Sequence, residues 1–404
     1  MATRAAARSL LVDIHTHTYL PRYAALLRAR STAPRILSRP KQGSKDVLEE
    51  RLVILDNEPS GGRPVGPQYW DREQKLAFMD KHGIDVSVVS TANPWLDFLP
   101  PDTASTLARE LNDDLESYCA TSPTFTATAA TSHQMKRLYA LGLLPLVPSV
   151  PIASVLSAID QIATLPHLRG VIVGTRGLGK GLDDAALEPV WQKLAANSLV
   201  VFIHPHYGVG GADAWGERDN GHVLPLALGF PFETTTAITR LILAGVLDRH
   251  PSLKLLLAHS GGTLPQLSSR LASCITHDPA VAARLQHDAR WYLGRLWFDA
   301  VCYGPEELEF VASAIGRASR YAESDKIKPG DQTLVAAERK DGSKRLLWGT
   351  DHPFFPPIGE GAQDEKWMSV MENLEAVDAV GPWGAEEKDG VRGGNAIELF
   401  GLDK

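Results

Sequence analysis

Short apolar stretches alternate with longer helical patterns along almost the whole 404-residue chain. This alternation is typical of βαβ units, in which parallel strands are joined by helices. The predicted strands are Leu11–His17, Val86–Ser90, Leu143–Val147, Gly170–Val173, Leu199–His204, Leu253–His259, Trp297–Val301 and Arg345–Asp351. The predicted helices are Asp71–His82, Thr103–Ala120, Ile152–Leu165, Asp184–Asn197, Glu233–His250, Thr263–Thr276, Pro305–Ile315 and Gln363–Val377. Eight such pairs predict an α/β fold, a closed (β/α)8 TIM barrel that forms one domain over residues 1–404.

Three segments depart from this repeat. Residues 27–70 form a Pro- and Arg-rich inserted arm, and residues 207–232 a long loop rich in Gly, Pro and aromatic residues. Residues 317–344 are charged and polar, so we expect a surface insertion there. We assign no function to this insertion or to residues 121–142.

Composition excludes several classes of partner. The formal net charge is −7 and no basic stripe is concentrated anywhere, so we expect no nucleic-acid partner. No apolar run approaches the roughly 18–20 residues of a membrane-spanning helix. The three cysteines are scattered and form no Cys-x-x-Cys pair, which fits a reducing compartment. We therefore expect a cytoplasmic protein.

Polar residues with metal-binding side chains follow the predicted strands. His15 and His17 share one face of the first strand, because side chains alternate across a strand. His204, His259 and Asp351 close the fifth, sixth and eighth strands. The carboxyl ends of barrel strands meet at one rim, so the fold would gather these five side chains in one site.

Two further histidines and one glycine-rich turn have simpler interpretations. Pro205 ends the strand before His206, which favours loop packing over contact with metal or substrate. His352 would point away from Asp351, which favours a structural role. The turn 174–181 nearly matches a phosphate-binding loop, but Gly181 replaces the Ser or Thr that would hold magnesium.

At these positions the sequence resembles the amidohydrolase superfamily. The resemblance is to its decarboxylase branch, around aminocarboxymuconate-semialdehyde decarboxylase and the fungal uracil-5-carboxylate (isoorotate) decarboxylases. The fungal group is the more similar of the two. The residues that carry it are Val12–His17 (VDIHTH), Ala92–Trp95 (ANPW), Gly174–Asp184 (GTRGLGKGLDD), Ile203–Gly208 (IHPHYG), Leu228–Thr235 (LGFPFETT), Ala258–Pro265 (AHSGGTLP) and Gly349–Pro357 (GTDHPFFPP).

The resemblance implies one divalent metal ion per chain. Its ligands would be His15, His17, His204 and Asp351, with His259 beside them. Zinc is the usual ion, and manganese is also compatible with nitrogen and carboxylate ligands. Dinuclear members use a lysine near the end of the fourth strand, and Gly170–Val173 is followed by no lysine there.

The resemblance also implies a metal-dependent carboxy-lyase that converts uracil-5-carboxylate to uracil and CO₂. Protonation of the carboxylate-bearing carbon would precede loss of CO₂, and we assign the proton transfer to the pair Asp351 and His259. Candidate substrate-binding residues are Arg63, Asn93, Phe354 and Arg270. Arg270 matches a position that reaches a neighbouring subunit's site in the aminocarboxymuconate enzymes, so a homodimer is expected.

Three alternatives remain at this point. The first is a hydrolase that uses the same metal to attack a lactone, amide or ester. The second is a decarboxylase of another small carboxylate, either aminocarboxymuconate semialdehyde or a dihydroxybenzoate. The third is a metal-binding protein without enzymatic activity.

Overall fold

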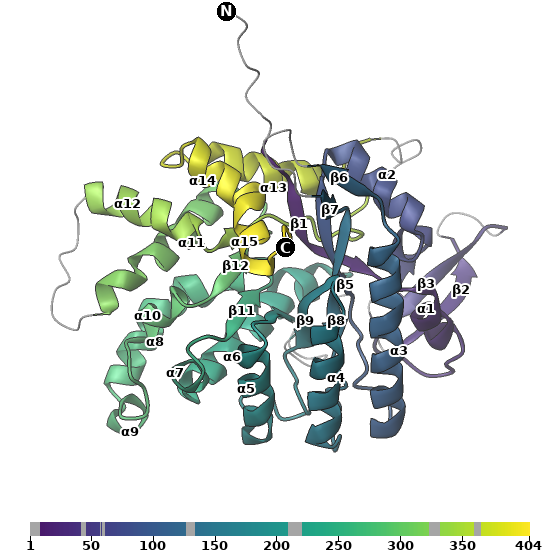
Figure 1. Ribbon diagram of the computed structural model, residues 1–404, viewed down its shortest axis with the longest axis horizontal. Helices are drawn as coiled ribbons and strands as arrows, with labels where there is room; N and C mark the ends of the chain where they lie inside the picture. The colour runs from purple at the N-terminus through teal and green to yellow at the C-terminus, as the bar shows by residue number, and fades with distance from the viewer. Residues whose placement is uncertain are drawn as a thin grey trace, which may run out of the picture.

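The computed structural model describes residues 9–41, 46–56, 58, 61–126, 134–208, 220–322, 332–358 and 365–404. Its centre is a sheet of eight strands that follow one another in chain order and pair in parallel (Figure 1). They are β1 (Val12–Thr18), β5 (Val86–Thr91), β8 (Leu138–Leu143), β9 (Leu168–Gly174), β10 (Val200–His204), β11 (Lys254–Leu257), β12 (Trp297–Asp299) and β13 (Leu346–Leu347). The predicted TIM-barrel fold is confirmed.

The barrel closes where the chain after β13 runs along β1. Ile14 N donates to Trp348 O at 3.2 Å, and His17 N donates to His352 O at 2.7 Å. Between them, Asp351 N donates to His15 O at 2.7 Å. Residues near the two ends of the sequence therefore lie side by side at the rim of the barrel.

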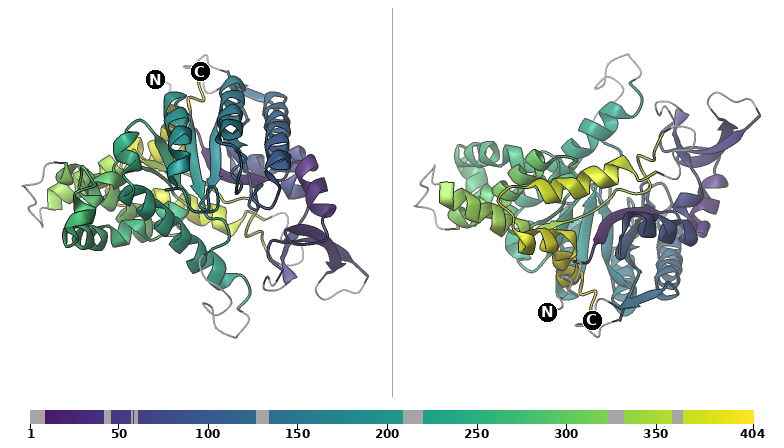
Figure 2. Two further views of the ribbon diagram at one scale, coloured as in Figure 1. Left: turned by 90° about the horizontal axis from the view of Figure 1, so that it is seen from below. Right: turned by 90° about the horizontal axis from the view of Figure 1, so that it is seen from above.

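Helices cover the outside of the barrel, as Figures 1 and 2 show. Those that connect successive barrel strands are α2 (Arg72–His82), α3 (Pro101–Ala120), α4 (Ile152–Thr164), α5 (Glu188–Ala196), α6 (Phe230–Leu243), α7 (Val246–Arg249), α8 (Leu264–Thr276), α9 (Pro279–Ala282), α10 (Ala289–Leu293), α11 (Pro305–Gly316) and α12 (Gln332–Ser343). The helices α13 (Met368–Ala379), α14 (Ala385–Asp389) and α15 (Asn395–Phe400) follow β13. In α3 the apolar residues Leu107, Leu111 and Leu115, spaced four apart along one side of the helix, are buried. Within the described residues, no helix is long and apolar enough to cross a bilayer.

The predicted third strand, Leu143–Val147, is wrong. The strand is β8, which ends at Leu143, because Pro145 and Pro148 have no N–H group to donate to a ladder. Asn112 of α3 satisfies the backbone where the ladder stops. Its Nδ2 donates to Leu143 O at 3.1 Å, and its Oδ1 accepts from Leu143 N at 2.7 Å.

The sixth and eighth ladders are also shorter than predicted. After β11, His259 begins the short helix η6 (His259–Gly261) and has a φ of 52°. After β13, Trp348 N donates to Val391 O at 2.9 Å, and Asp351 has a φ of 56°. His259 and Asp351 therefore lie in turns just beyond their strands. A left-handed conformation is costly for residues other than glycine and is concentrated at functional sites.

The inserted arm contains an antiparallel sheet. Its strands are β2 (Arg35–Pro40), β3 (Leu48–Val53) and β4 (Arg63–Val65), preceded by α1 (Pro21–Arg28) and followed by the short helix η2 (Pro67–Tyr69). This sheet stands out from the barrel beside α1 (Figure 1). The arm returns to the end of β1, where Tyr69 O accepts from Tyr19 N at 2.8 Å and Thr18 Oγ1 at 2.5 Å. This return brings β4, and with it Arg63, to the rim.

The remaining predicted departures contain regular structure. Residues 121–142 include the antiparallel pair β6 (Thr124–Thr126) and β7 (Gln134–Lys136), with residues 127–133 outside the described range, in addition to most of β8. Part of the predicted loop 207–232, residues 209–219, lies outside the described residues, and helical structure begins by Pro225. In the insertion 317–344, residues 323–331 are outside the described range, and α12 packs closely on α11. A Cβ at Gly342 would lie 2.0 Å from Ala312 O, so glycine permits this contact.

Asn112→Ala should destabilise the barrel, because both backbone groups of Leu143 would be left unpaired in the core. Each unpaired group costs about 1–3 kcal/mol, so we expect a loss of roughly 2–6 kcal/mol in the free energy of unfolding, measured by urea denaturation. Asn197→Ala is the control, since this exposed asparagine only caps the end of α5. Equal losses in the two variants would contradict this role for Asn112.

Candidate metal centre

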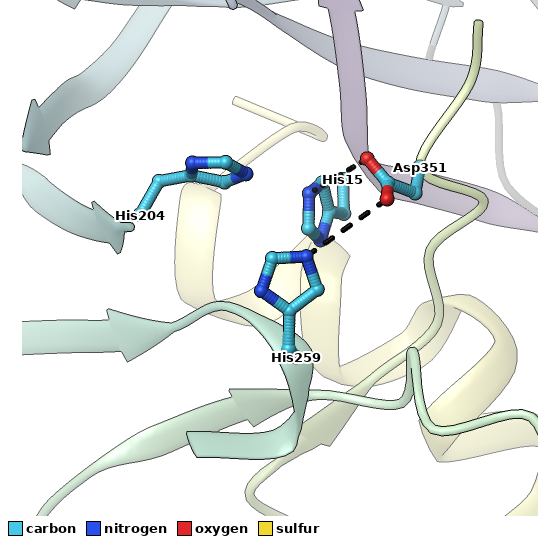
Figure 3. Close-up of side chains that lie close together, drawn as sticks. All are labelled: His15, His204, His259 and Asp351. Atoms are coloured by element: carbon cyan, nitrogen blue, oxygen red, sulfur yellow. Dashed lines mark ion pairs between the residues drawn. The ribbon is translucent and has the colours of Figure 1, made fainter. Parts of the chain in front are cut away.

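Four predicted site residues meet at the carboxyl ends of the barrel strands. One ligand atom from each of His15, His204, His259 and Asp351 lies within 4.8 Å of the others (Figure 3). They come from β1, the end of β10, the turn after β11 and the segment after β13. The cluster is buried except for His259, which is partly exposed. The rim that the sequence predicted is therefore a metal-binding site.

His17 completes a tight triangle of ligand atoms in this cluster. Its Nε2 lies 3.1 Å from His15 Nε2, and both nitrogens lie 3.4 Å from Asp351 Oδ1. Two ligands bound about 2.1 Å from the same tetrahedral zinc ion lie about 3.4 Å apart. The three atoms are therefore spaced as ligands of one ion.

The imidazole rings are oriented by bonds on their outer nitrogens. The Nδ1 partners are Asp299 Oδ2 for His15 at 2.6 Å, Pro205 O for His204 at 2.8 Å and Ser90 Oγ for His17 at 3.1 Å. An N–H group at Nδ1 leaves the lone pair on Nε2, which is the atom that binds a metal. His204 Nε2 is buried and has no hydrogen-bond partner in the described structure, although buried polar atoms are normally paired. The residues present thus fit a divalent metal ion.

The neighbouring histidines keep the Asp351 carboxylate charged. Burial raises the pKa of the Asp351 carboxyl, but His15, His17 and His259 outweigh it and hold that pKa well below its usual value. Burial lowers the pKa of His17 to about 4 and that of His204 well below its usual range. One anionic and two neutral ligands are therefore available to a cation.

His15 differs from the other two histidines. Burial lowers its pKa, but the charge of Asp351 and the hydrogen bond to Asp299 outweigh burial and raise this pKa to about 10. A metal ion at Nε2 would compete with that proton, which is the usual coupling between metal binding and ligand protonation.

The two oxygens of Asp351 face different partners. Oδ1 faces His15 and His17, whereas Oδ2 lies 3.8 Å from His259 Nε2. The His259 side chain is 16% exposed, and it is the histidine on the open side of the cluster. His259 is one of the four residues whose ligand atoms gather here, and its place beside the ligands, rather than among them, stays a prediction.

Asp299 is the residue that the sequence analysis missed. It is fully buried at the end of β12, and its Oδ2 also accepts from His259 N at 2.9 Å. Its Oδ1 accepts from Ser260 N at 2.8 Å. One carboxylate thus orients His15 and fixes the turn that carries His259. A signal was available, because Asp299 is a carboxylate within the predicted seventh strand, and the observed strand ends at this residue.

The end of β9 has no room for a bridging lysine. A Cβ at Gly174 would lie 2.4 Å from the Trp95 ring and 2.5 Å from His206 Nδ1. Lys180 is exposed, and its carbonyl accepts from Arg240 Nη2 at 2.6 Å. The structure therefore supports a site for one metal ion, and Arg240 lies against the turn that resembled a phosphate-binding loop.

Three candidate substrate-binding residues lie together beside the cluster. Arg63 Nη2 donates to Tyr19 OH at 2.8 Å and to Asn93 O at 3.0 Å. The Arg63 guanidinium lies 4.4 Å from the centre of the Phe354 ring, whose edge faces His17 at 5.5 Å between ring centres. The Asn93 amide donates to His206 O at 2.5 Å. Arg63 and Phe354 therefore border the metal ligands, while Asn93 also holds the loop after β10.

The other weighed residues lie outside the cluster. His206 Nε2 lies 3.1 Å from Asp97 Oδ2 and its ring packs against Trp95, as loop packing requires. His352 lies between aromatic rings, 3.8 Å from that of Phe78 between ring centres, on the far side of β1. Arg270 is exposed on α8.

Comparison with known proteins agrees with this geometry. The amidohydrolase family matches residues 12–402. This chain belongs to the amidohydrolase family. It is 26% identical to the 2-amino-3-carboxymuconate-6-semialdehyde decarboxylase of Dictyostelium discoideum, over 98% of this chain and 93% of that one. It is 31% identical to the decarboxylase yanB of Aspergillus niger, over 84% and 82% of the two chains.

A solved structure is similar over its full length. The apo form of the Metarhizium anisopliae IDCase is 38% identical, with a TM-score of 0.82 and 100% of both chains covered. Its relatives place this amidohydrolase among the metal-dependent decarboxylases, which are carbon–carbon lyases.

Asp299→Asn should weaken metal binding 10- to 100-fold, the usual effect of changing an outer partner of a ligating histidine. An amide has only one acceptor oxygen, so it cannot serve His15, His259 and Ser260 together. Zinc affinity of the refilled protein, measured by competition with a chelator, tests this expectation. Glu306→Gln, an exposed carboxylate at the start of α11, is the control. An unchanged affinity in Asp299→Asn would contradict the orienting role.

Proposed function

We propose that this decarboxylase converts uracil-5-carboxylate to uracil and CO₂ with one zinc ion per chain. The observation that carries the proposal is the full-length likeness to IDCase, an isoorotate decarboxylase. It is combined with the position of Arg63 and Phe354, which lie against each other beside the candidate metal ligands. Manganese is the alternative ion, because the ligand set of imidazoles and carboxylate suits both metals.

Arg63 and Phe354 suit a planar ring that carries a carboxylate. Arg63 Nε is buried and has no hydrogen-bond partner among the described residues, so a substrate oxygen would satisfy it. A guanidinium recognises carboxylate well, because its N–H groups form a planar fork. Phe354 offers a ring against which a pyrimidine can pack. Asn93 would help through the groups that it positions, since its amide is already bonded to the chain.

The reaction requires a proton and returns an electron pair to the ring. A proton adds to C5 of the uracil-5-carboxylate, using the electrons of the C5–C6 double bond. The bond from C5 to the carboxylate carbon then breaks, its electron pair restores the double bond, and CO₂ leaves. We assign the proton to the pair His259 and Asp351, whose Nε2 and Oδ2 face each other at 3.8 Å. When bound, a divalent ion supplies Lewis-acid binding for the carboxylate and the adjacent ring oxygen.

The alternatives do not have equal support. The named relatives are decarboxylases, which disfavours a hydrolase. Aminocarboxymuconate semialdehyde or a dihydroxybenzoate remain the second candidate substrates, since the same ligands serve them. The homodimer stays a prediction, in which Arg270 on the exposed face of α8 would approach a second copy's site.

Purified, zinc-assayed protein should release uracil and CO₂ from 5-carboxyuracil, followed by ultraviolet absorbance. Asp351→Asn should abolish turnover, because the pair loses its carboxylate and the metal loses a ligand. Asp102→Asn, the same change at an exposed aspartate in the first turn of α3, is the matched control. No turnover by zinc-loaded protein would reject the uracil substrate, and turnover of aminocarboxymuconate semialdehyde or a dihydroxybenzoate would replace it.

Arg63→Gln should raise the KM for 5-carboxyuracil roughly 10- to 100-fold, since a hydrogen bond to a charged group contributes about 1.5–3 kcal/mol. We expect a smaller change in kcat, because the guanidinium binds the substrate without transferring a proton. Steady-state kinetics separate the two constants. Arg22→Gln, an exposed arginine of α1, should change neither. A normal KM in Arg63→Gln would contradict carboxylate recognition by this residue.

A further inference from the structure

A second buried charged pair lies behind the metal centre. Asp13 is fully buried and Lys75 of α2 is 3% exposed, and Lys75 Nζ lies 3.6 Å from Asp13 Oδ2. Lys75 Nζ also donates to Thr16 Oγ1 at 2.5 Å. Among the described hydrogen bonds and ion pairs, none joins Asp13 or Lys75 to a candidate substrate-binding residue. The proposed reaction therefore leaves the pair without a role.

An irregularity in β1 separates this pair from the metal ligands. The pairing of β1 with β5 shifts between Asp13 and Thr16, where three steps on β1 match two on β5. An extra residue of this kind re-aims side chains, and such bulges occur next to active sites. Asp13 and Thr16 consequently both face Lys75, while His15 and His17 face the metal centre.

The Asp13 carboxylate binds the segment that carries Asp351. Its Oδ1 accepts from Thr350 N at 3.1 Å, and its Oδ2 accepts from Thr350 Oγ1 at 2.9 Å. Thr350 Oγ1 in turn accepts from His352 N at 3.1 Å. The residues on both sides of Asp351 are thus fixed by one buried network. Asp351 itself has the left-handed φ of 56°, a conformation that persists only where the surroundings enforce it.

We propose that Asp13 and Lys75 are positioning residues for Asp351. Asp13 holds Thr350, and this contact keeps the Asp351 carboxylate directed at the histidines. Lys75 supplies the opposite charge that a buried carboxylate needs, because burying an unpaired ion is unfavourable. The proposal concerns metal binding and does not depend on which substrate the enzyme decarboxylates.

The test compares two substitutions at Thr350, one that keeps the hydroxyl and one that keeps the shape of the side chain. Thr350→Val removes the hydroxyl that joins Asp13 to His352, whereas Thr350→Ser keeps it. Metal-free protein is refilled with zinc alone, and zinc affinity is measured by chelator competition together with the melting temperature. We expect zinc binding at least tenfold weaker in Thr350→Val and within twofold of wild type in Thr350→Ser. Lys75→Met should also weaken zinc binding at least tenfold.

Glu338→Gln distinguishes positioning from general stability. Glu338 lies on α12, and the substitution disrupts its partly buried ion pair with Arg320, a contact that involves none of the candidate metal ligands. We expect a lower melting temperature with zinc affinity within twofold of wild type. Zinc affinity in Thr350→Val within threefold of wild type would overturn the proposal, and so would a parallel loss in Glu338→Gln. If Lys75→Met does not fold, the Thr350 pair decides the question.

Discussion

The contact between β1 and residues 348–352 is the constraint on which the site depends. It closes the barrel, because His15 O accepts from Asp351 N and His17 N donates to His352 O. The same hydrogen bonds bring the Asp351 carboxylate to the Nε2 atoms of His15 and His17. Barrel closure and the approach of Asp351 to His15 and His17 therefore depend on the same contact, made by residues more than 330 positions apart.

The same contact explains why so many polar side chains are buried at the rim of the barrel. The imidazoles of His15, His17 and His204 each have a partner on Nδ1, and Asp299 serves both His15 and the turn of His259. On the opposite face of β1, Lys75 pairs with Asp13, and the Asp13 carboxylate binds Thr350 in the segment that closes the barrel. Buried polar groups are tolerated only where such networks satisfy them, so the surroundings of the ligands are as constrained as the ligands.

The sequence predicted the barrel, and the gathering of these side chains at its rim, for one physical reason. Parallel strands buried on both faces have a clear apolar pattern, and their carboxyl ends must share a rim. His15, His17, His204, His259 and Asp351 could therefore be brought together from their positions alone. The same reasoning applied to the third strand failed, because Pro145 and Pro148 interrupt the apolar stretch and Asn112, distant in sequence, ends the true strand. It also missed Asp299, a short-strand residue whose partners are backbone N–H groups and a histidine on another strand.

Crystals of the zinc-loaded protein, with anomalous scattering recorded at the zinc edge, test the central claim most directly. The account predicts one zinc peak per chain, bonded to Nε2 of His15, His17 and His204 and to Asp351 Oδ1, with His259 Nε2 outside bonding distance. Two zinc peaks in the rim, or one ion bonded to His259 in place of His17, would contradict it.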